Sequence, residues 1–211
     1  MERRDVLVDR LISLGYLKTP AVISAMRSVK REFFLPHDFE RYAYEDSPLP
    51  IGGEQTISAP HMVAIMCEAA ELSRGQRVLE IGAGSGYHAC VTAHVTKSMV
   101  YSIERLTELA RSARANLNRA GCRDVRVIEG DGTEGYEKEA PYDRIIVTAA
   151  APSVPPRLID QLTPGGKLLI PVGSRYSQEL LRITKEAEGV RRESLGGCVF
   201  VPLIGKHGWK G

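Results

Sequence analysis

Apolar residues in the first third of the chain recur at helical spacing. Those between residues 22 and 29 fall on one helical face, and they follow Thr19-Pro20, a suitable N-cap and first position because proline lacks an N–H that this position does not use. A second apolar stripe, over residues 63–72, predicts a helix that begins at Pro60. Residues 36–53 follow no such period, and their prolines and glycines predict an irregular segment that ends in a turn.

The pattern changes at Gln76. Short apolar segments then alternate with amphipathic ones about every 20–30 residues, as strands and helices do in α/β proteins. Strands are predicted at residues 77–81, 100–103, 125–128, 144–148 and 167–171, with helices between them that include 107–120 and 155–162. This order predicts an α/β fold with a doubly wound, mostly parallel, Rossmann-like sheet that helices cover on both faces.

The end of the chain departs from this alternation. Residues 180–184 and 198–201 are predicted as strands with no long helix between them, so we expect an antiparallel C-terminal strand pair. The sequence shows no internal repeat and no low-complexity segment. We therefore expect a single domain over residues 1–211, with a helical N-terminal extension at 1–75 and an α/β core at 76–211.

The composition is that of a soluble globular protein. Apolar residues make up 43% and charged residues 26% of the 211 positions, and 28 basic against 26 acidic side chains leave a formal charge of +2. This near-neutral balance argues against a protein that holds nucleic acid mainly by neutralising phosphates. The short basic cluster Arg191-Arg192 is predicted to be a solvated turn.

Signals for membranes, secretion and metals are missing from the sequence. No apolar run reaches the roughly 18 residues of a membrane span, and residues 1–5 lead into an amphipathic stretch instead of a signal-peptide core. The four cysteines include no CxxC pair, and the five histidines show no metal-binding spacing. We expect a cytoplasmic protein that holds no metal.

A glycine loop follows the strand at 77–81. Gly82, Gly84 and Gly86 stand between this strand and a helix, where the backbone of an α/β protein approaches a ligand. The dinucleotide motif GxGxxG would need a glycine where Tyr87 stands, and the loop lacks the ending of a P-loop. The spacing therefore favours a nucleoside without pyrophosphate; the alternative is a turn needed only for close packing.

Acidic residues follow the next two strands. Glu104 can accept hydrogen bonds from both hydroxyls of a ribose, unless it is a solvated residue that caps the next helix. Asp131 can accept from an adenine amino group while Gly132 lets the ring approach the backbone, unless the pair forms only an Asp-Gly turn. Because the three features end successive strands, together they predict a nucleoside site.

These residues resemble class I S-adenosylmethionine-dependent methyltransferases and, more narrowly, the protein-L-isoaspartate (D-aspartate) O-methyltransferase family. The glycine strand is common to methyltransferases, whereas the segment around Ser58 is specific to the repair enzymes. The resemblance covers nearly the whole chain and rests on residues 55–62 (QTISAPHM), 78–87 (VLEIGAGSGY), 130–132 (GDG), 164–166 (PGG) and 200–203 (FVPL).

The resemblance implies methyl transfer from S-adenosylmethionine to the free α-carboxylate of L-isoaspartyl residues in damaged proteins and peptides, which begins their repair through a succinimide. It gives Ser58, in the N-terminal extension, the central catalytic role and places Ser58 and Val201 beside the substrate. It also implies an unusual order of the last two strands, and we expect a monomer that binds neither nucleic acid nor membranes. The cofactor-binding residues it implies are Thr56, Ile57, Gly82, Gly84, Glu104, Asp131 and Gly132.

A carboxylate nucleophile needs few catalytic groups. A carboxyl group with a pKa of about 4 is already ionised at neutral pH, so no general base is required. The Ser58 hydroxyl can hold one carboxylate oxygen and aim the other at the methyl group; alternatively, Ser58 is the N-cap of the helix that begins near Pro60. Because no proton moves, we expect His61 to be structural or to line the pocket.

The residues alone do not exclude three other functions. A methyltransferase acting on RNA or a small molecule would share the cofactor half, although an RNA enzyme should carry a basic groove with stacking aromatics, and aromatic residues are only 6% here. A nicotinamide-dependent oxidoreductase is disfavoured by the early third glycine. A non-catalytic cofactor-binding protein is compatible with the presence of Ser58.

Overall fold

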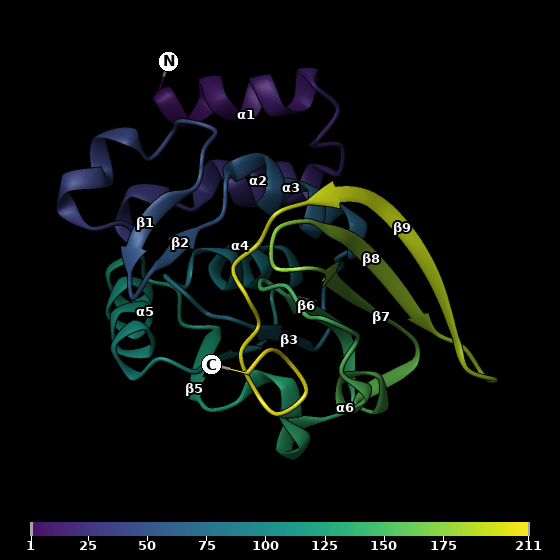
Figure 1. Cartoon of the computed structure of the whole chain (residues 1–211). Coiled ribbons are helices and arrows are strands. Elements are labelled where there is room, and N and C mark those ends of the chain that lie inside the picture. The colour runs from purple at the N-terminus through teal and green to yellow at the C-terminus, as the bar shows by residue number, and fades with distance from the viewer. Residues whose placement is uncertain (1, 211) are drawn as a thin grey trace.

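The structure is a computed structural model that describes residues 2–210 (Figure 1). Its centre is a seven-stranded sheet with the strand order β5-β4-β3-β6-β7-β8-β9. Strands β3 to β7 are parallel, and β8 is antiparallel to both of its neighbours, which confirms the predicted sheet. The strands are β3 (Val78–Ile81), β4 (Val100–Glu104), β5 (Val125–Glu129), β6 (Tyr142–Val147), β7 (Leu162–Gly173), β8 (Gln178–Lys185) and β9 (Val190–Cys198).

The two faces of the sheet are covered differently. On one face, strand residues such as Val78 and Ile146 pack against four helices. On the other face, residues such as Leu79 and Ile145 pack against the short helix α6 (Pro156–Asp160) and against the C-terminal segment, including Leu203. The four helices of the first face are α2 (Pro20–Ser28), α3 (Pro60–Ala69), α4 (Tyr87–Thr96) and α5 (Thr107–Arg119).

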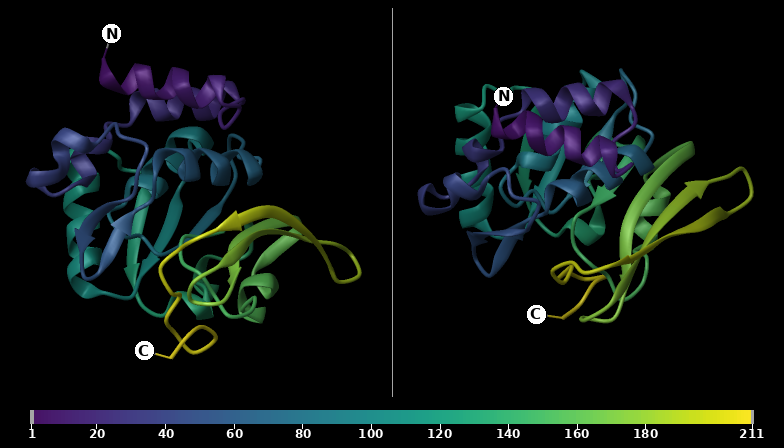
Figure 2. Two further views of the ribbon diagram at one scale, coloured as in Figure 1. Left: turned by 45° about the horizontal axis from the view of Figure 1, so that its top comes forward. Right: turned by 90° about the horizontal axis from the view of Figure 1, so that it is seen from above.

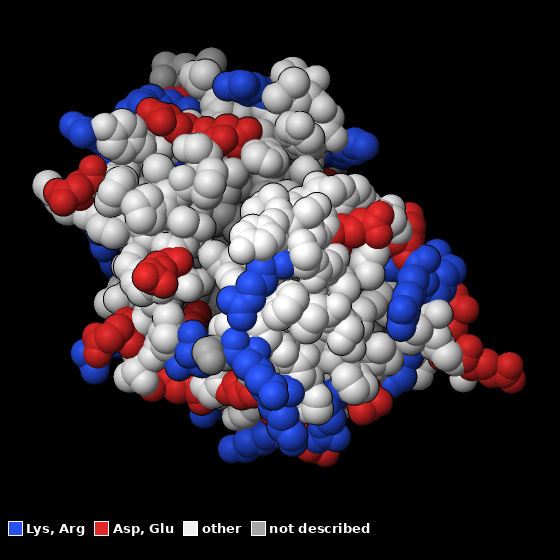
Figure 3. Space-filling model, viewed as in Figure 1, with Lys and Arg blue, Asp and Glu red and all other residues white. Residues whose placement is uncertain are grey.

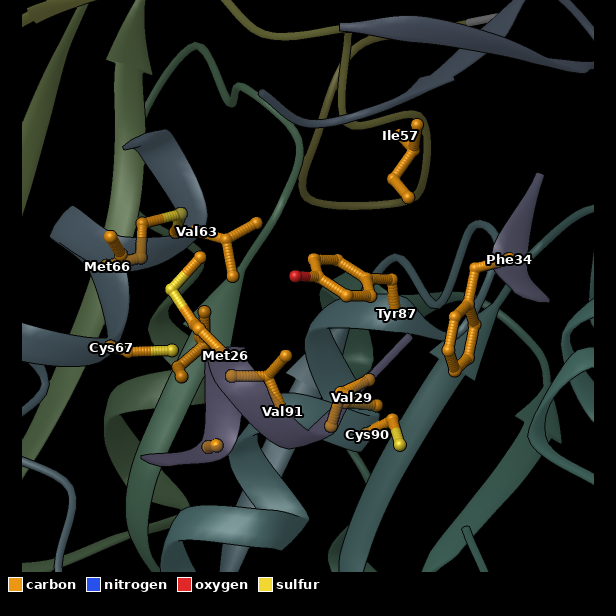
Figure 4. Packing of buried hydrophobic residues seen from close by; sticks show 14 of the residues in the cluster. Met26, Val29, Phe34, Ile57, Val63, Met66, Cys67, Tyr87, Cys90 and Val91 are labelled. Carbon is orange, nitrogen blue, oxygen red and sulfur yellow. The ribbon is translucent and has the colours of Figure 1, made fainter. Parts of the chain in front are cut away.

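The N-terminal extension forms a layer of helices above the first face, in which α1 (Arg3–Ser13) lies over α2 and α3 (Figure 1). Helices α2, α3 and α4 contribute Met26, Val63 and Tyr87 to one apolar cluster, and Phe34 packs edge-on against the Tyr87 ring at a centroid distance of 5.5 Å (Figure 4). This packing joins the extension to the helix that follows the glycine loop.

The predicted helix starts at Pro20 and Pro60 are confirmed, but Thr19 does not cap α2 with its side chain. The Thr19 hydroxyl instead donates to Glu68 Oε2 at 2.6 Å, which links α2 to α3.

The segment predicted as irregular contains more structure than expected. A 3₁₀ helix, η1 (Arg31–Phe34), directly precedes the segment. The segment itself holds another 3₁₀ helix, η2 (His37–Tyr42), and then strand β1 (Leu49–Gly52), which pairs with β2 (Gln55–Ile57). The turn therefore lies at Gly53 and Glu54, both with positive φ, after a strand that includes Pro50. A proline fits there because β1 is an edge strand, where one N–H is not needed for pairing.

The last strand was predicted in the wrong place. Only Cys198 of the predicted strand 198–201 belongs to β9, which spans Val190–Cys198. β9 is an edge strand whose side chains are exposed or half-buried, so it lacks the apolar signal of a central strand. Arg191 and Arg192 lie within this strand, solvated as predicted but not in a turn. With β8, it forms a hairpin that projects from the body of the protein (Figure 2).

Acidic and basic side chains both occur on the face that carries the C-terminal segment (Figure 3). Within residues 2–210, no helix combines the length and the apolar character needed to cross a bilayer.

Candidate active site

The loops that follow four parallel strands meet at one cavity. The ends of β3, β4, β5 and β6 bring Gly82, Glu104, Gly132 and Thr148 to its wall, as parallel topology requires at the carboxyl edge of a sheet. The cavity is open to solvent on one side and spans about 610 Å³ with that solvent included. We call it the first cavity.

The glycine loop is held in a conformation that favours glycine. Gly82, Gly84 and Gly86 have φ angles of 95°, 52° and 90°. A Cβ on Gly82 would overlap the Thr148 hydroxyl, and one on Gly86 would lie 3.1 Å from Leu117. Packing is therefore part of the reason for these glycines, whereas Gly82 and Gly84 also line the cavity.

Glu104 is not the solvated residue of the alternative interpretation, since it is 8% exposed. The N–H of Gly84 donates to its Oε2 at 2.9 Å, and the N–H of Leu106 donates to its Oε1 at 3.0 Å. Each oxygen keeps a second lone pair, and the residue lines the first cavity. The carboxylate is therefore fixed where it can accept hydrogen bonds from a diol.

Asp131 lies beside the first cavity and is not part of its wall. Its Oδ1 accepts hydrogen bonds from the N–H and hydroxyl of Thr133, and its Oδ2 accepts one from the N–H of Lys206 at 2.7 Å. Partial burial alone would raise the pKa of Asp131, but these donors hold it below its ordinary value. The carboxylate caps a short 3₁₀ helix and ties the C-terminal segment down, so a contact with adenine stays a prediction.

Gly132 lines the first cavity, but close packing, and not only the approach of a ligand, requires a glycine at this position. A Cβ at this position would overlap the side chain of Ile81, which also lines the cavity. Gly132 thus lets the loop after β5 pack against the end of β3.

Ser58 lies in a second cavity, which is open to solvent, spans about 1080 Å³ with that solvent included, and is also lined by His61 and residues 197–201. The N-cap of α3 is Ala59, so the alternative role of Ser58 as N-cap is wrong. Among the hydrogen bonds of residues 2–210, none involves the Ser58 hydroxyl, which leaves it available to a ligand. The first and second cavities share Thr56, Thr148 and Val201 in their walls.

Buried Arg31 fixes the main chain at Ser58. The residue is 1% exposed, and its guanidinium donates to the carbonyl oxygens of Ala43 at 2.7 Å and of Ser47 and Ser58 at 3.1 Å. Burial lowers the pKa of Arg31, and the three carbonyl acceptors offset part of the cost of burying its charge. Nothing in the sequence marks this residue, because its partners are brought together only by the fold.

Ile57 lies deeper than its predicted neighbours. It is 4% exposed and lines a third, smaller cavity of about 350 Å³ under the glycine loop, together with Ser58, His88 and Thr148. It does not line the first cavity, so a direct contact with the cofactor there stays a prediction.

His61 lines the second cavity, in agreement with its predicted pocket-lining role. Its Nδ1 lies 2.9 Å from Asp46 Oδ1, which also accepts from the His61 N–H. Since an ionised carboxylate only accepts, Nδ1 carries a proton and the ring is held in one orientation.

Val201 belongs to the segment that leaves β9 and forms the wall between the first and second cavities. Its carbonyl oxygen accepts from the N–H of Ala150 at 2.8 Å, and the N–H of Leu203 donates back to the Ala150 oxygen at 2.8 Å. These bonds hold residues 201–203 beside the loop after β6. Within residues 2–210, no group of three or more His, Cys, Asp or Glu side chains is arranged to hold a metal ion.

A buried acid lies directly under the glycine loop. Glu80 is 1% exposed; its Oε1 accepts from the Ser102 hydroxyl at 2.7 Å, and its Oε2 lies 3.6 Å from His88 Nδ1. Burial raises the pKa of Glu80 to about 8 and lowers that of His88 to about 4. Both side chains are therefore neutral near pH 7, which suits their place in the core.

We expect the free energy of unfolding to fall by up to about 2 kcal/mol as pH rises from 6.5 to 8. The folded chain keeps the Glu80 proton up to pH 8, whereas the unfolded chain loses it near pH 4.5, so this stabilisation disappears as pH rises. His88 acts in the opposite sense below its ordinary pKa of 6.5, because the unfolded chain then takes up a proton that the folded chain excludes. Chemical denaturation at several pH values should show the fall only above 6.5, and Glu80→Gln should abolish it. An equal fall in that variant would assign the effect to other groups.

The similarity of this chain to known proteins agrees with this site. The family model of protein-L-isoaspartate(D-aspartate) O-methyltransferase matches residues 2–208. The protein-L-isoaspartate O-methyltransferases of Methanopyrus kandleri and Hyperthermus butylicus are 56% and 54% identical, over 98% and 99% of this chain and 93% and 91% of theirs. A Plasmodium falciparum protein-L-isoaspartate O-methyltransferase in complex with S-adenosyl-L-homocysteine has a TM-score of 0.86 at 28% identity, covering 97% of this chain and 99% of that one. The chain belongs to the protein-L-isoaspartate O-methyltransferase family.

Proposed function

We propose that the protein transfers a methyl group from S-adenosylmethionine to the free α-carboxylate of L-isoaspartyl residues in damaged proteins and peptides. The observation that carries this proposal is the pair of adjoining cavities, one at the glycine loop and Glu104 and the other at Ser58, with three residues common to both walls. Membership of the family sets aside the nicotinamide-dependent oxidoreductase that the glycine spacing had left open.

The first cavity fits the cofactor. It lies at the carboxyl ends of parallel strands beside the glycine loop, and Glu104 presents fixed acceptor oxygens to it. We infer that Glu104 holds the ribose, that Gly82, Gly84 and Gly132 let the ligand approach the backbone, and that Thr56 and Ile57 lie beside it. When bound, S-adenosylmethionine supplies a methyl group attached to a positively charged sulfur.

Ser58 then has a simple task. Its hydroxyl donates to one oxygen of the substrate carboxylate, which is ionised at neutral pH, and directs the other oxygen toward the shared wall of the two cavities. A neutral donor holds the carboxylate without neutralising it as an arginine or lysine would. The N–H of Val201 supplies a second donor, and exclusion of water by the surrounding apolar residues favours loss of the opposite charges.

The ester explains the repair. The ester has a better leaving group than the free acid, so the neighbouring peptide nitrogen attacks the ester carbonyl carbon and closes a succinimide ring. The C–OCH₃ bond breaks, and the methoxy group leaves as methanol with the proton of that nitrogen. Hydrolysis of the ring regenerates some normal aspartyl linkage. In this scheme the protein makes only the ester, and the later steps are spontaneous.

Recognition of such a substrate depends on its backbone, because isoaspartyl sites arise in many sequences. Residues 197–201 line the second cavity and comprise the end of the edge strand β9 and its continuation, which suits an extended peptide held by main-chain hydrogen bonds. We propose that the protein acts as a cytoplasmic monomer on peptides and proteins and does not bind nucleic acid.

A paired-peptide assay tests the function. The protein is incubated with labelled S-adenosylmethionine and either an isoaspartyl peptide or its normal aspartyl counterpart. Base-labile label on the isoaspartyl peptide alone is the expected result. Equal labelling of both peptides, or labelling only of RNA offered in parallel, would overturn the proposal. Rates that differed a thousandfold among peptides with scrambled flanks would contradict recognition through the backbone.

A further inference from the structure

Two of the four cysteines meet where α4 packs against the end of α5. Cys90 belongs to α4, and its N–H donates to the carbonyl oxygen of Gly86 at 3.0 Å. Cys122 follows α5, and its N–H donates to the carbonyl oxygen of Leu117 at 2.9 Å. Gly86 and Leu117 pack closely, since a Cβ on Gly86 would lie 3.1 Å from Leu117 Cγ. Each cysteine is therefore one hydrogen bond away from the same contact between the helices.

The thiols of Cys90 and Cys122 are hydrogen-bonded to each other. This bond lowers the pKa of Cys122 and, together with burial, raises the pKa of Cys90, so Cys122 ionises first while Cys90 keeps its proton. Access to solvent differs in the same sense, because Cys122 is half-buried and Cys90 is only 2% exposed. The more reactive thiol of the pair is thus the one that a dissolved oxidant can reach.

The other two cysteines have no thiol neighbour among residues 2–210. Cys67 is fully buried, its Sγ lies 3.4 Å from His88 Nε2, and burial raises its pKa. Cys198 is half-buried, and burial raises its pKa to about 11. In the described chain, Cys90 and Cys122 are therefore the two cysteines best placed for an internal disulfide.

The position of Cys122 allows the sulfurs to come closer. Hydrogen-bonded thiols are farther apart than the about 2.05 Å of an S–S bond, so one sulfur must approach the other. Cys122 lies in the connection between α5, which ends at Arg119, and β5, which begins at Val125. Rotation of a side chain in this connection breaks no hydrogen bond within either element.

We propose that Cys90 and Cys122 form a reversible disulfide when the protein meets a small disulfide such as oxidised glutathione. The Cys122 thiolate attacks one sulfur of the oxidant, releases a thiolate and becomes a mixed disulfide. The Cys90 thiol then passes its proton to a released thiolate and attacks the Cys122 sulfur, which expels the second small thiol. The oxidant is reduced to two thiols while the two cysteines are oxidised to one disulfide. This inference does not rest on the proposed function.

The disulfide would tie together two helices that begin at the cofactor side of the sheet. α4 follows the glycine loop, and α5 follows Glu104. The bond closes a loop of about 30 residues, which restricts the unfolded chain and so stabilises the folded one. We expect the oxidised protein to melt about 5–10 °C above the reduced protein.

The test treats the folded protein with oxidised glutathione, maps its peptides by mass spectrometry and records thermal unfolding. The wild type should show a link between Cys90 and Cys122 and the higher melting temperature, both reversed by dithiothreitol. Cys90→Ala should stop at the mixed disulfide on Cys122, and Cys122→Ala should leave Cys90 unmodified. Cys198→Ser is the matched control, because Cys198 is also half-buried but lacks a thiol neighbour, and this variant should form the link as the wild type does.

The wild type alone decides the proposal, whether or not each variant folds. A stable glutathione adduct on its Cys122, a link that forms only in denaturant, or an oxidised protein that melts no higher than the reduced one would overturn the inference. Modification of Cys90 in Cys122→Ala would contradict the order of the two steps. None of these outcomes bears on methyl transfer, which the paired-peptide assay tests separately.

Discussion

Replacing Ser58 by alanine is expected to lower kcat by about 100-fold and to change the Kd of S-adenosylmethionine by less than about twofold, because a hydrogen bond to a charged group contributes about 1.5–3 kcal/mol. The hydroxyl lines the second cavity, on the substrate side of the shared wall, and does not line the first cavity with Glu104. Its loss leaves the carboxylate free to rotate away from the methyl group, so the effect should fall on turnover.

The measurement needs steady-state rates with an isoaspartyl peptide and a separate binding titration with the cofactor. Ser24→Ala is a matched control, since Ser24 is an exposed serine of α2, away from all three cavities. A Ser58→Ala protein with normal turnover would remove the proposed role of this hydroxyl. A parallel loss of cofactor affinity would show that Ser58 serves the first cavity as well.

The sequence predicted best those features that depend on a strong local pattern. Buried strands such as β3 (VLEI) and β4 (VYSIE) are mostly apolar, and the prolines at 20 and 60 mark helix starts. The edge strand β9 could not be found in this way, because solvent covers one of its edges and most of its side chains. Its apolar continuation at 199–201 was mistaken for the strand itself.

The site was predictable where a residue ends a parallel strand, as Glu104 does. It was less predictable where the role depends on contacts from distant parts of the chain. Asp131 has the spacing of a ligand-binding acid, yet its oxygens are occupied by Thr133 and by Lys206, which lies 75 positions away. Arg31 and Thr148 gave no signal at all, since their partners are backbone carbonyls that no sequence pattern reveals.

Replacing Glu104 by alanine is expected to weaken S-adenosylmethionine binding roughly 100-fold or more, because two hydrogen bonds to a charged acceptor are lost at about 1.5–3 kcal/mol each. The residue is 8% exposed and lines the first cavity, so water cannot replace its hydrogen bonds to the ligand without a loss of binding free energy. Removing it also leaves the N–H groups of Gly84 and Leu106 without their acceptor, which loosens the glycine loop. Both effects act in the same direction on affinity.

Glu104→Gln separates the two effects. The glutamine keeps one carbonyl oxygen, but its NH₂ must face either the Gly84 or the Leu106 N–H, so we expect an affinity between those of the wild type and the alanine variant. Glu108→Ala is the control, because Glu108 is an exposed acid in the first turn of α5 whose one ion-pair partner among residues 2–210 is Arg111. Titration by calorimetry, with thermal unfolding of the ligand-free proteins alongside, measures affinity and loop stability separately. If Glu104→Ala bound the cofactor as tightly as Glu108→Ala, other residues would have to hold the ribose. The buried carboxylate would then serve only to stabilise the glycine loop.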